Sequence, residues 1–144
     1  MDWMLALHVI VLAMGTGMSF SNYVNMRLAA GMEDAAGQAA LARLRLTLGR
    51  VGDGVVALLW LSGVALLLRY VGGDADAASA LPVAFHAKML LVVLLTVCHG
   101  VSRWAGLRIM RQGRTELVPV ARACTLGVFL SAVGSIVLAV ASFG

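Results

Sequence analysis

The sequence predicts an all-α integral membrane protein, folded as a four-helix bundle, and three observations support this prediction. The chain has 144 residues, of which 61% are hydrophobic and only 12% are charged. The apolar residues gather in four long runs, each with the roughly 20 residues that a helix needs to cross a bilayer. In segments of this length, only helices satisfy every backbone polar group within lipid. We therefore expect one membrane domain over residues 1–144, without a soluble module.

The four predicted helices cover about residues 3–27, 48–70, 83–110 and 117–143. The first is expected to begin at Trp3, because an indole ring suits the membrane interface. The chain starts Met1-Asp2-Trp3 and so lacks the basic residues that open a secretory signal peptide. We therefore interpret the first apolar run as a transmembrane helix.

Helix formers, glycine and proline predict the remaining boundaries. Residues 39–50 are expected to extend the second helix beyond the membrane, and Gly72-Gly73 marks its end. Pro82 and Pro119 suit the first turns of the third and fourth helices, where the missing N–H costs nothing.

Arginine is unevenly distributed between the two sides of the predicted bundle. Most arginines lie in or beside the first and third connections, namely Arg27, Arg43, Arg45, Arg50, Arg108, Arg111, Arg114 and Arg122. The second connection carries Asp74 and Asp76, with only Arg69 at its edge. The positive-inside rule then places the first and third connections in the cytoplasm and both termini on the outer side of the membrane. The net charge of +4 reflects this topology, and we expect no nucleic-acid partner.

Ionisable residues within the apolar runs are the candidate functional residues, because insertion scales place the cost of a central Lys or Arg at roughly 2.5–3.5 kcal/mol. The third run contains His86, the only lysine Lys88, and then His99 and Arg103. Lys88 is either a functional cation or a side chain that reaches the nearby headgroups. His99 is either a ligand or proton relay, or a hydrogen-bonded residue inside the bundle.

His8 and His86 form the best candidate pair of metal ligands. The predicted first and third helices run in the same direction, and each histidine lies close to the start of its helix, so the two share a similar depth. Two imidazoles at one depth can hold a haem iron from both sides. The alternative is two interfacial histidines that bind lipid, water or backbone. His99 lies about 20 Å further along the axis than His86, so it cannot ligate the same metal.

Asp53 is the one acid within a predicted transmembrane segment. Arg50 precedes it by one helical turn, and we expect a local ion pair between the two. A proton acceptor in a redox site is the alternative role for Asp53. Cys98 and Cys124 lack the spacing of a metal site or a disulfide, and we interpret them as buried thiols.

Short stretches of the first and third helices resemble the HemJ-type protoporphyrinogen IX oxidases, small four-helix membrane proteins of bacteria. These stretches are LALHVI at residues 5–10, FHAKMLLV at 85–92, and then Cys98-His99-Gly100 and Arg103. The resemblance implies haem b held by His8 and His86. It also implies oxidation of protoporphyrinogen IX with Lys88, His99 and Arg103 as catalytic residues. Because the chain has no flavin or nicotinamide motif, the electrons would pass to a quinone or a respiratory-chain partner.

Two further hypotheses stay open. A non-catalytic or electron-transfer haem b subunit of a larger complex would explain why family elements such as the helix 2 proline are absent, with Gly52-Asp53-Gly54 nearby instead. A haem-free packing subunit would use the histidines only as hydrogen-bonded polar groups. The third helix carries polar residues on two opposite sides, and the fourth has a small-residue seam of Gly127, Ser131 and Ser135. Both features predict an oligomer or a subunit of a membrane complex.

Overall fold

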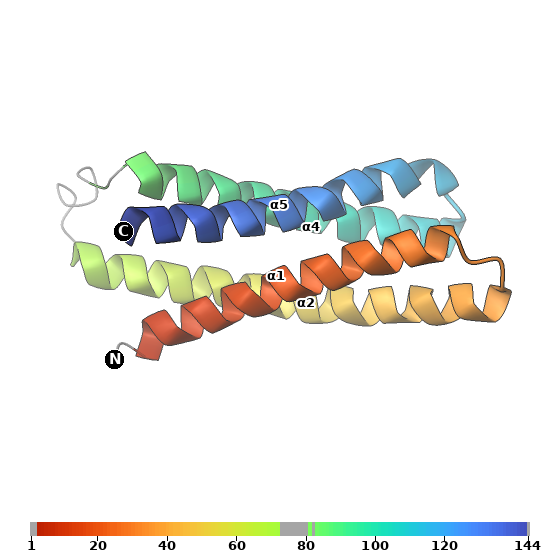
Figure 1. Ribbon diagram of the computed structural model, residues 1–144, viewed down its shortest axis with the longest axis horizontal. Coiled ribbons are helices and arrows are strands. Elements are labelled where there is room, and N and C mark those ends of the chain that lie inside the picture. Colours follow the sequence, from red (N-terminus) through yellow and green to blue (C-terminus); the bar gives the residue numbers. More distant parts are fainter. Residues whose placement is uncertain (1–2, 73–80, 82, 144) are drawn as a thin grey trace.

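A computed structural model describes residues 3–72, 81 and 83–143, and within them the chain forms four long α-helices and one short 3-10 helix. The elements are α1 (Trp3–Ala30), α2 (Ala35–Val71), α4 (Val83–Gln112), η1 (Thr115–Leu117) and α5 (Val118–Phe143). The helices run up and down as one elongated bundle, and α1 begins at the same end of the bundle at which α5 ends (Figure 1). The predicted fold class, an all-α four-helix bundle, is confirmed.

Each of the four helices is long and apolar enough to cross a membrane, which supports a multi-pass membrane protein. Their most apolar windows have mean hydropathies of 1.7, 2.0, 1.7 and 1.8. Large apolar side chains cover the outside of the bundle; Leu61 and Leu90, for example, are 68% and 69% exposed. In water such a surface would be a liability, whereas contact with lipid makes it favourable.

Helix α2 is 37 residues long and extends well past the apolar run that predicted it. Its first turn is capped by Asp34, whose side chain accepts hydrogen bonds from the backbone N–H groups of Ala36 and Gly37. The expected extension of this helix toward its N-terminus is therefore present. The helix ends at Gly72, whose φ of 62° is the left-handed conformation that favours glycine at a helix end.

The bundle consists of two tightly packed helix pairs, α1 with α2 and α4 with α5. In the first pair Val11 and Leu12 pack against Val55 and Leu59. In the second pair Leu95 packs against Val128 and Ala132.

The small-residue seam of α5 lies inside this bundle. Ser131 and Ser135 are buried, and a Cβ added to Gly127 would lie 2.9 Å from Cys98 Sγ on α4. The seam therefore serves close packing within one chain, and it no longer argues for a contact between chains.

The side of α4 that carries His86 faces away from the bundle. His86, Val93, Gly100 and Trp104 are all exposed on the outside of the bundle. Of the two features that predicted a contact beyond one bundle, the α5 seam is buried, and this side of α4 is the one that could still contact another protein.

Candidate functional site

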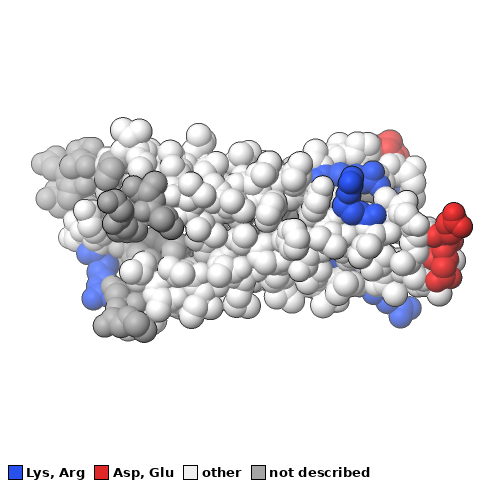
Figure 2. Space-filling model, in the orientation of Figure 1, with Lys and Arg blue, Asp and Glu red and all other residues white. Residues whose placement is uncertain are grey.

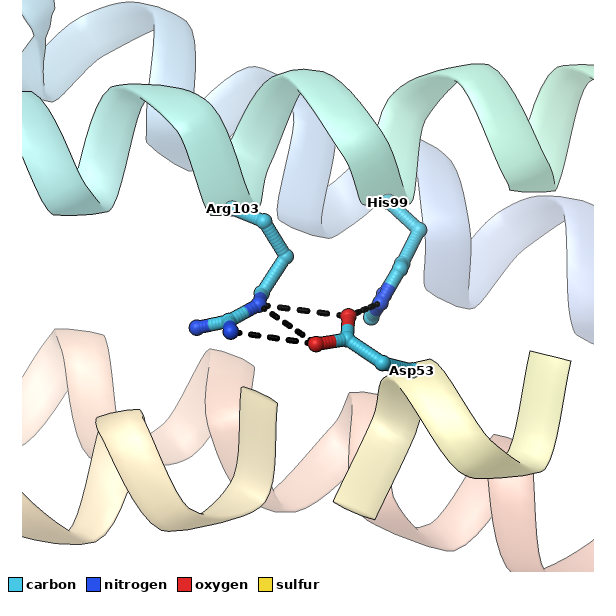
Figure 3. Close-up of polar contacts among 3 residues, drawn as sticks. All are labelled: Asp53, His99 and Arg103. Atoms are coloured by element: carbon cyan, nitrogen blue, oxygen red, sulfur yellow. Dashed lines mark hydrogen bonds and ion pairs between the residues drawn. The ribbon is translucent and has the colours of Figure 1, made fainter. Parts of the chain in front are cut away.

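Three ionisable side chains meet across the seam between α2 and α4 (Figure 3). Asp53 projects from α2, and His99 and Arg103 project from α4, one helical turn apart. His99 Nε2 lies 2.8 Å from Asp53 Oδ1. Arg103 donates from Nε to both carboxylate oxygens at 3.2 Å and from Nη2 to Oδ2 at 3.0 Å. We call these residues the Asp53–His99–Arg103 cluster.

The predicted ion pair between Arg50 and Asp53 is wrong. In the described part of the chain, the ion-pair partners of Asp53 are His99 and Arg103, and Arg50 is not among them. The prediction considered only neighbours on the same helix. The closeness of α2 and α4 depends on how the helices pack, which spacing within one helix does not reveal.

Two glycines on α2 make room for this cluster. A Cβ at Gly52 would lie 2.9 Å from His99 Cε1, and one at Gly49 would lie 2.7 Å from Arg103 Nη1. Both distances are shorter than real Cβ contacts. Because Gly49 and Gly52 precede Asp53 on neighbouring faces of the helix, the pattern Gly-x-x-Gly-Asp inside an apolar run is the sequence signal that indicates this site.

We expect Gly52→Ala to destabilise the protein relative to Gly54→Ala. Both changes bring the same gain in helix propensity, but the space around Gly54 is open to 4 Å, whereas the new methyl group at residue 52 would clash with the His99 ring. Overpacking of this kind costs roughly 1–3 kcal/mol. Thermal unfolding of both variants in detergent measures the difference. Equal unfolding midpoints would show that the His99 ring does not lie against Gly52.

A cavity of about 210 Å³ lies beside the cluster and is lined by α1, α2, α4 and α5. His99 and Arg103 form part of its wall, and most of the remainder is apolar. Polar groups also reach it from Asn22 and Thr125. Asn22 Oδ1 is buried and has no hydrogen-bond partner among the described residues. A mainly apolar cavity with a few polar groups suits a molecule of mixed character.

The cluster connects this cavity with the outside of the bundle. Asp53 does not line the cavity, and its side chain is 50% exposed, whereas His99 and Arg103 are 19% and 23% exposed. The guanidinium of Arg103 donates to both carboxylate oxygens and so holds the orientation of Asp53. Because the imidazole stands between the carboxylate and the cavity, the arrangement is suited to moving a proton between the cavity and Asp53.

His8, the first of the predicted haem ligands, is buried and contacts α2. His8 Nδ1 lies 2.8 Å from Ser62 Oγ. The Ser62 hydroxyl donates its proton to Leu58 O at 2.7 Å, so its contact with His8 requires the ring nitrogen to be the donor. A proton on Nδ1 leaves the lone pair of a neutral imidazole on Nε2. That is the state of a metal-ligating histidine held by a neighbouring acceptor.

The structure does not gather all the predicted site residues in one place. His86 is exposed at the start of α4, where its ring meets Phe85 edge-on with centroids 6.1 Å apart. Lys88 is half-buried and close enough to His8 for their charges to interact. About 16 Å of helix separates Lys88 from His99. Lys88 therefore belongs with His8, while His99 and Arg103 belong with Asp53, which the sequence did not assign to them.

No three His, Cys, Asp or Glu side chains in the described ranges are placed to hold a metal ion together. Among these residue types, the described part of the chain would therefore supply at most two ligands to one metal ion. That number is enough for a haem iron, whose porphyrin supplies the other four nitrogens.

Comparisons of the chain with known protein families, with curated proteins and with solved structures find no significant match.

Proposed function

We propose that this protein is a haem b-binding membrane oxidoreductase similar to the HemJ-type protoporphyrinogen IX oxidases. The observation that carries the proposal is the Asp53–His99–Arg103 cluster beside a cavity within an apolar bundle. Charged groups inside a membrane span are costly and usually serve a function. The motif resemblance at His8, His86, Lys88, His99 and Arg103 supports the same assignment.

We place the protein in the bacterial inner membrane with both termini in the periplasm. Arginines gather toward the end of the bundle that holds the α1–α2 and α4–α5 connections (Figure 2). We call this the arginine-rich end, and the positive-inside rule assigns it to the cytoplasm. On the face shown, the described residues in the middle of the bundle carry no charged side chain, as a membrane-spanning region requires.

One residue of this chain, His8, is in the state that a haem ligand needs. Its Nδ1–H tautomer leaves Nε2 for the iron. His86, the second ligand that the resemblance implies, lies on the exposed outer side of α4, so it would have to reach this iron from outside the bundle. Lys88 supplies a cation within electrostatic range of His8 that would pair with a propionate. When bound, haem b supplies an iron that accepts and passes on single electrons. A quinone or a respiratory-chain partner is the proposed acceptor.

Oxidation of a porphyrinogen releases protons as well as electrons, and we assign the protons to the cluster. His99 Nε2 holds its proton toward Asp53 Oδ1, so Nδ1 is the atom that accepts a proton from the cavity side. The proton on Nε2 then passes to the half-exposed Asp53 carboxylate. Arg103 orients that carboxylate and keeps it ionised until the transfer.

Complementation tests this function directly. Expression in a bacterial strain without protoporphyrinogen oxidase is expected to restore haem synthesis and growth. His99→Phe should fail to do so, whereas Arg43→Gln, an exposed change outside the cavity, should succeed. Failure of the unaltered protein, when it is present in the membrane at a normal level, would contradict the enzymatic proposal.

The second candidate is a non-catalytic or electron-transfer haem b subunit of a larger membrane complex. The exposed stripe of α4 that runs from His86 to Trp104 favours it, because this face offers a surface to another subunit. Both candidates predict the absorption spectrum of a b-type haem. A haem-loaded protein that does not complement, and that copurifies with a membrane redox enzyme, would support the second candidate.

A further inference from the structure

Two arginines near the arginine-rich end share a cavity without a counter-ion. Arg45 on α2 and Arg122 on α5 line the same cavity of about 130 Å³. They are close enough for their positive charges to repel each other. Within the ranges that the structure describes, neither guanidinium takes part in an ion pair. Because arginine keeps its proton under all physiological conditions, titration does not relieve this repulsion.

The walls of this cavity offer no acid to balance the two charges. The other lining residues are all apolar: Met26, Ala29, Ala30, Ile109, Val118 and Ala121. Two positive side chains thus share one cavity without an acid in its walls, which is the electrostatic environment of an anion site.

The position of the cavity indicates which anion it meets. Arg45 lies just before the apolar part of α2, and Arg122 lies in the first turns of α5. Both therefore lie at the membrane boundary, where lipid phosphates are abundant. Basic pockets between transmembrane helices on the cytoplasmic side are known to bind anionic headgroups.

We propose that this cavity binds the phosphate of an anionic lipid headgroup, with Arg45 and Arg122 as its two ligands. A free phosphate ion would present the same chemistry to the two guanidinium groups. The site does not depend on haem or on porphyrinogen. Because Arg45 also lines the larger cavity, the test measures stabilisation by the anion and not haem content.

The test uses the full-length protein in detergent, to which phosphatidylglycerol or zwitterionic phosphatidylcholine is added. Phosphatidylglycerol is expected to raise the thermal unfolding midpoint more than phosphatidylcholine does. This difference should fall at least twofold in Arg45→Gln and Arg122→Gln, and it should persist in Arg45→Lys. The matched control is Arg43→Gln, which removes the same charge from an exposed position on α2 outside the cavity.

A second arm compares sodium phosphate with sodium chloride at equal ionic strength. Stabilisation by the lipid alone identifies a headgroup site, and equal stabilisation by inorganic phosphate identifies a free-anion site. The proposal would be overturned if Arg43→Gln, Arg45→Gln and Arg122→Gln all showed the same change in unfolding midpoint on adding phosphatidylglycerol. It would also be overturned if the two lipids stabilised the unaltered protein equally and phosphate had no effect. If Arg45→Gln does not fold, Arg122→Gln, an exposed position, decides the result alone.

Discussion

Asp53→Ala is expected to lower both the stability of the bundle and any activity of the site. The change leaves His99 and Arg103 without their shared acceptor, and Arg103 cannot become neutral. Breaking a fully buried pair costs about 3–5 kcal/mol, whereas an exposed pair contributes up to about 1 kcal/mol. The Asp53 side chain is 50% exposed, but within a membrane span water does not screen it, so we expect a loss near the buried value, about 3 kcal/mol, in the free energy of unfolding.

The decisive measurement is a double-mutant cycle, in which chemical or thermal unfolding in detergent gives the stability of each variant. Arg103→Ala should cost less in the Asp53→Ala background than in the unaltered protein, because the interaction is already lost. Glu33→Ala, at an exposed acid between α1 and α2, serves as the control and should leave stability nearly unchanged. Additive effects of the Asp53 and Arg103 changes would show that the two side chains do not interact.

The fold could be predicted from the sequence because the signals that determine it are local. Each apolar run is long enough to require a helix in lipid, and Gly72 ends α2 where the sequence indicated a stop. The early start of α2 likewise followed from helix formers after residue 38, and Asp34 caps it. None of these features depends on which helices are neighbours.

The candidate site was only partly predictable because it depends on helix pairing. His99 and Arg103 stood out as ionisable residues in an apolar run, and they do lie together. Their partner Asp53 was assigned to its own helix instead. Recognising the cluster would have required knowing that α2 and α4 face each other at Gly52, where only the absence of a side chain admits the imidazole.

The contact between His8 and Ser62 was missed for the same reason. Ser62 is a single hydroxyl within a long apolar run, and its own helix already accepts its proton at Leu58 O. Nothing in the spacing of α2 connects this serine with α1. The packing of α1 against α2 brings the two together, and this contact favours the tautomer that the proposed haem ligation by His8 requires.

His8→Ala is expected to abolish the b-type haem spectrum of the purified protein. The substitution removes the Nε2 lone pair that the Ser62 contact leaves available for the iron. His86→Ala should convert a low-spin spectrum to a high-spin or weakened one, because it removes the proposed second ligand. Absorption spectra of oxidised and reduced protein, recorded after expression with ample haem supply, measure both effects.

Ser62→Ala tests the same site by a graded change. The histidine remains, but its tautomer is no longer fixed, and losing such a supporting contact typically weakens metal binding by about 10–100-fold. His99→Ala should leave this haem in place, because His99 is hydrogen-bonded to Asp53 and lies about 20 Å from His86 along α4. An unchanged spectrum in both His8→Ala and His86→Ala would exclude these ligands. Loss of haem in His99→Ala alone would instead move the haem to the cavity beside Asp53 and Arg103.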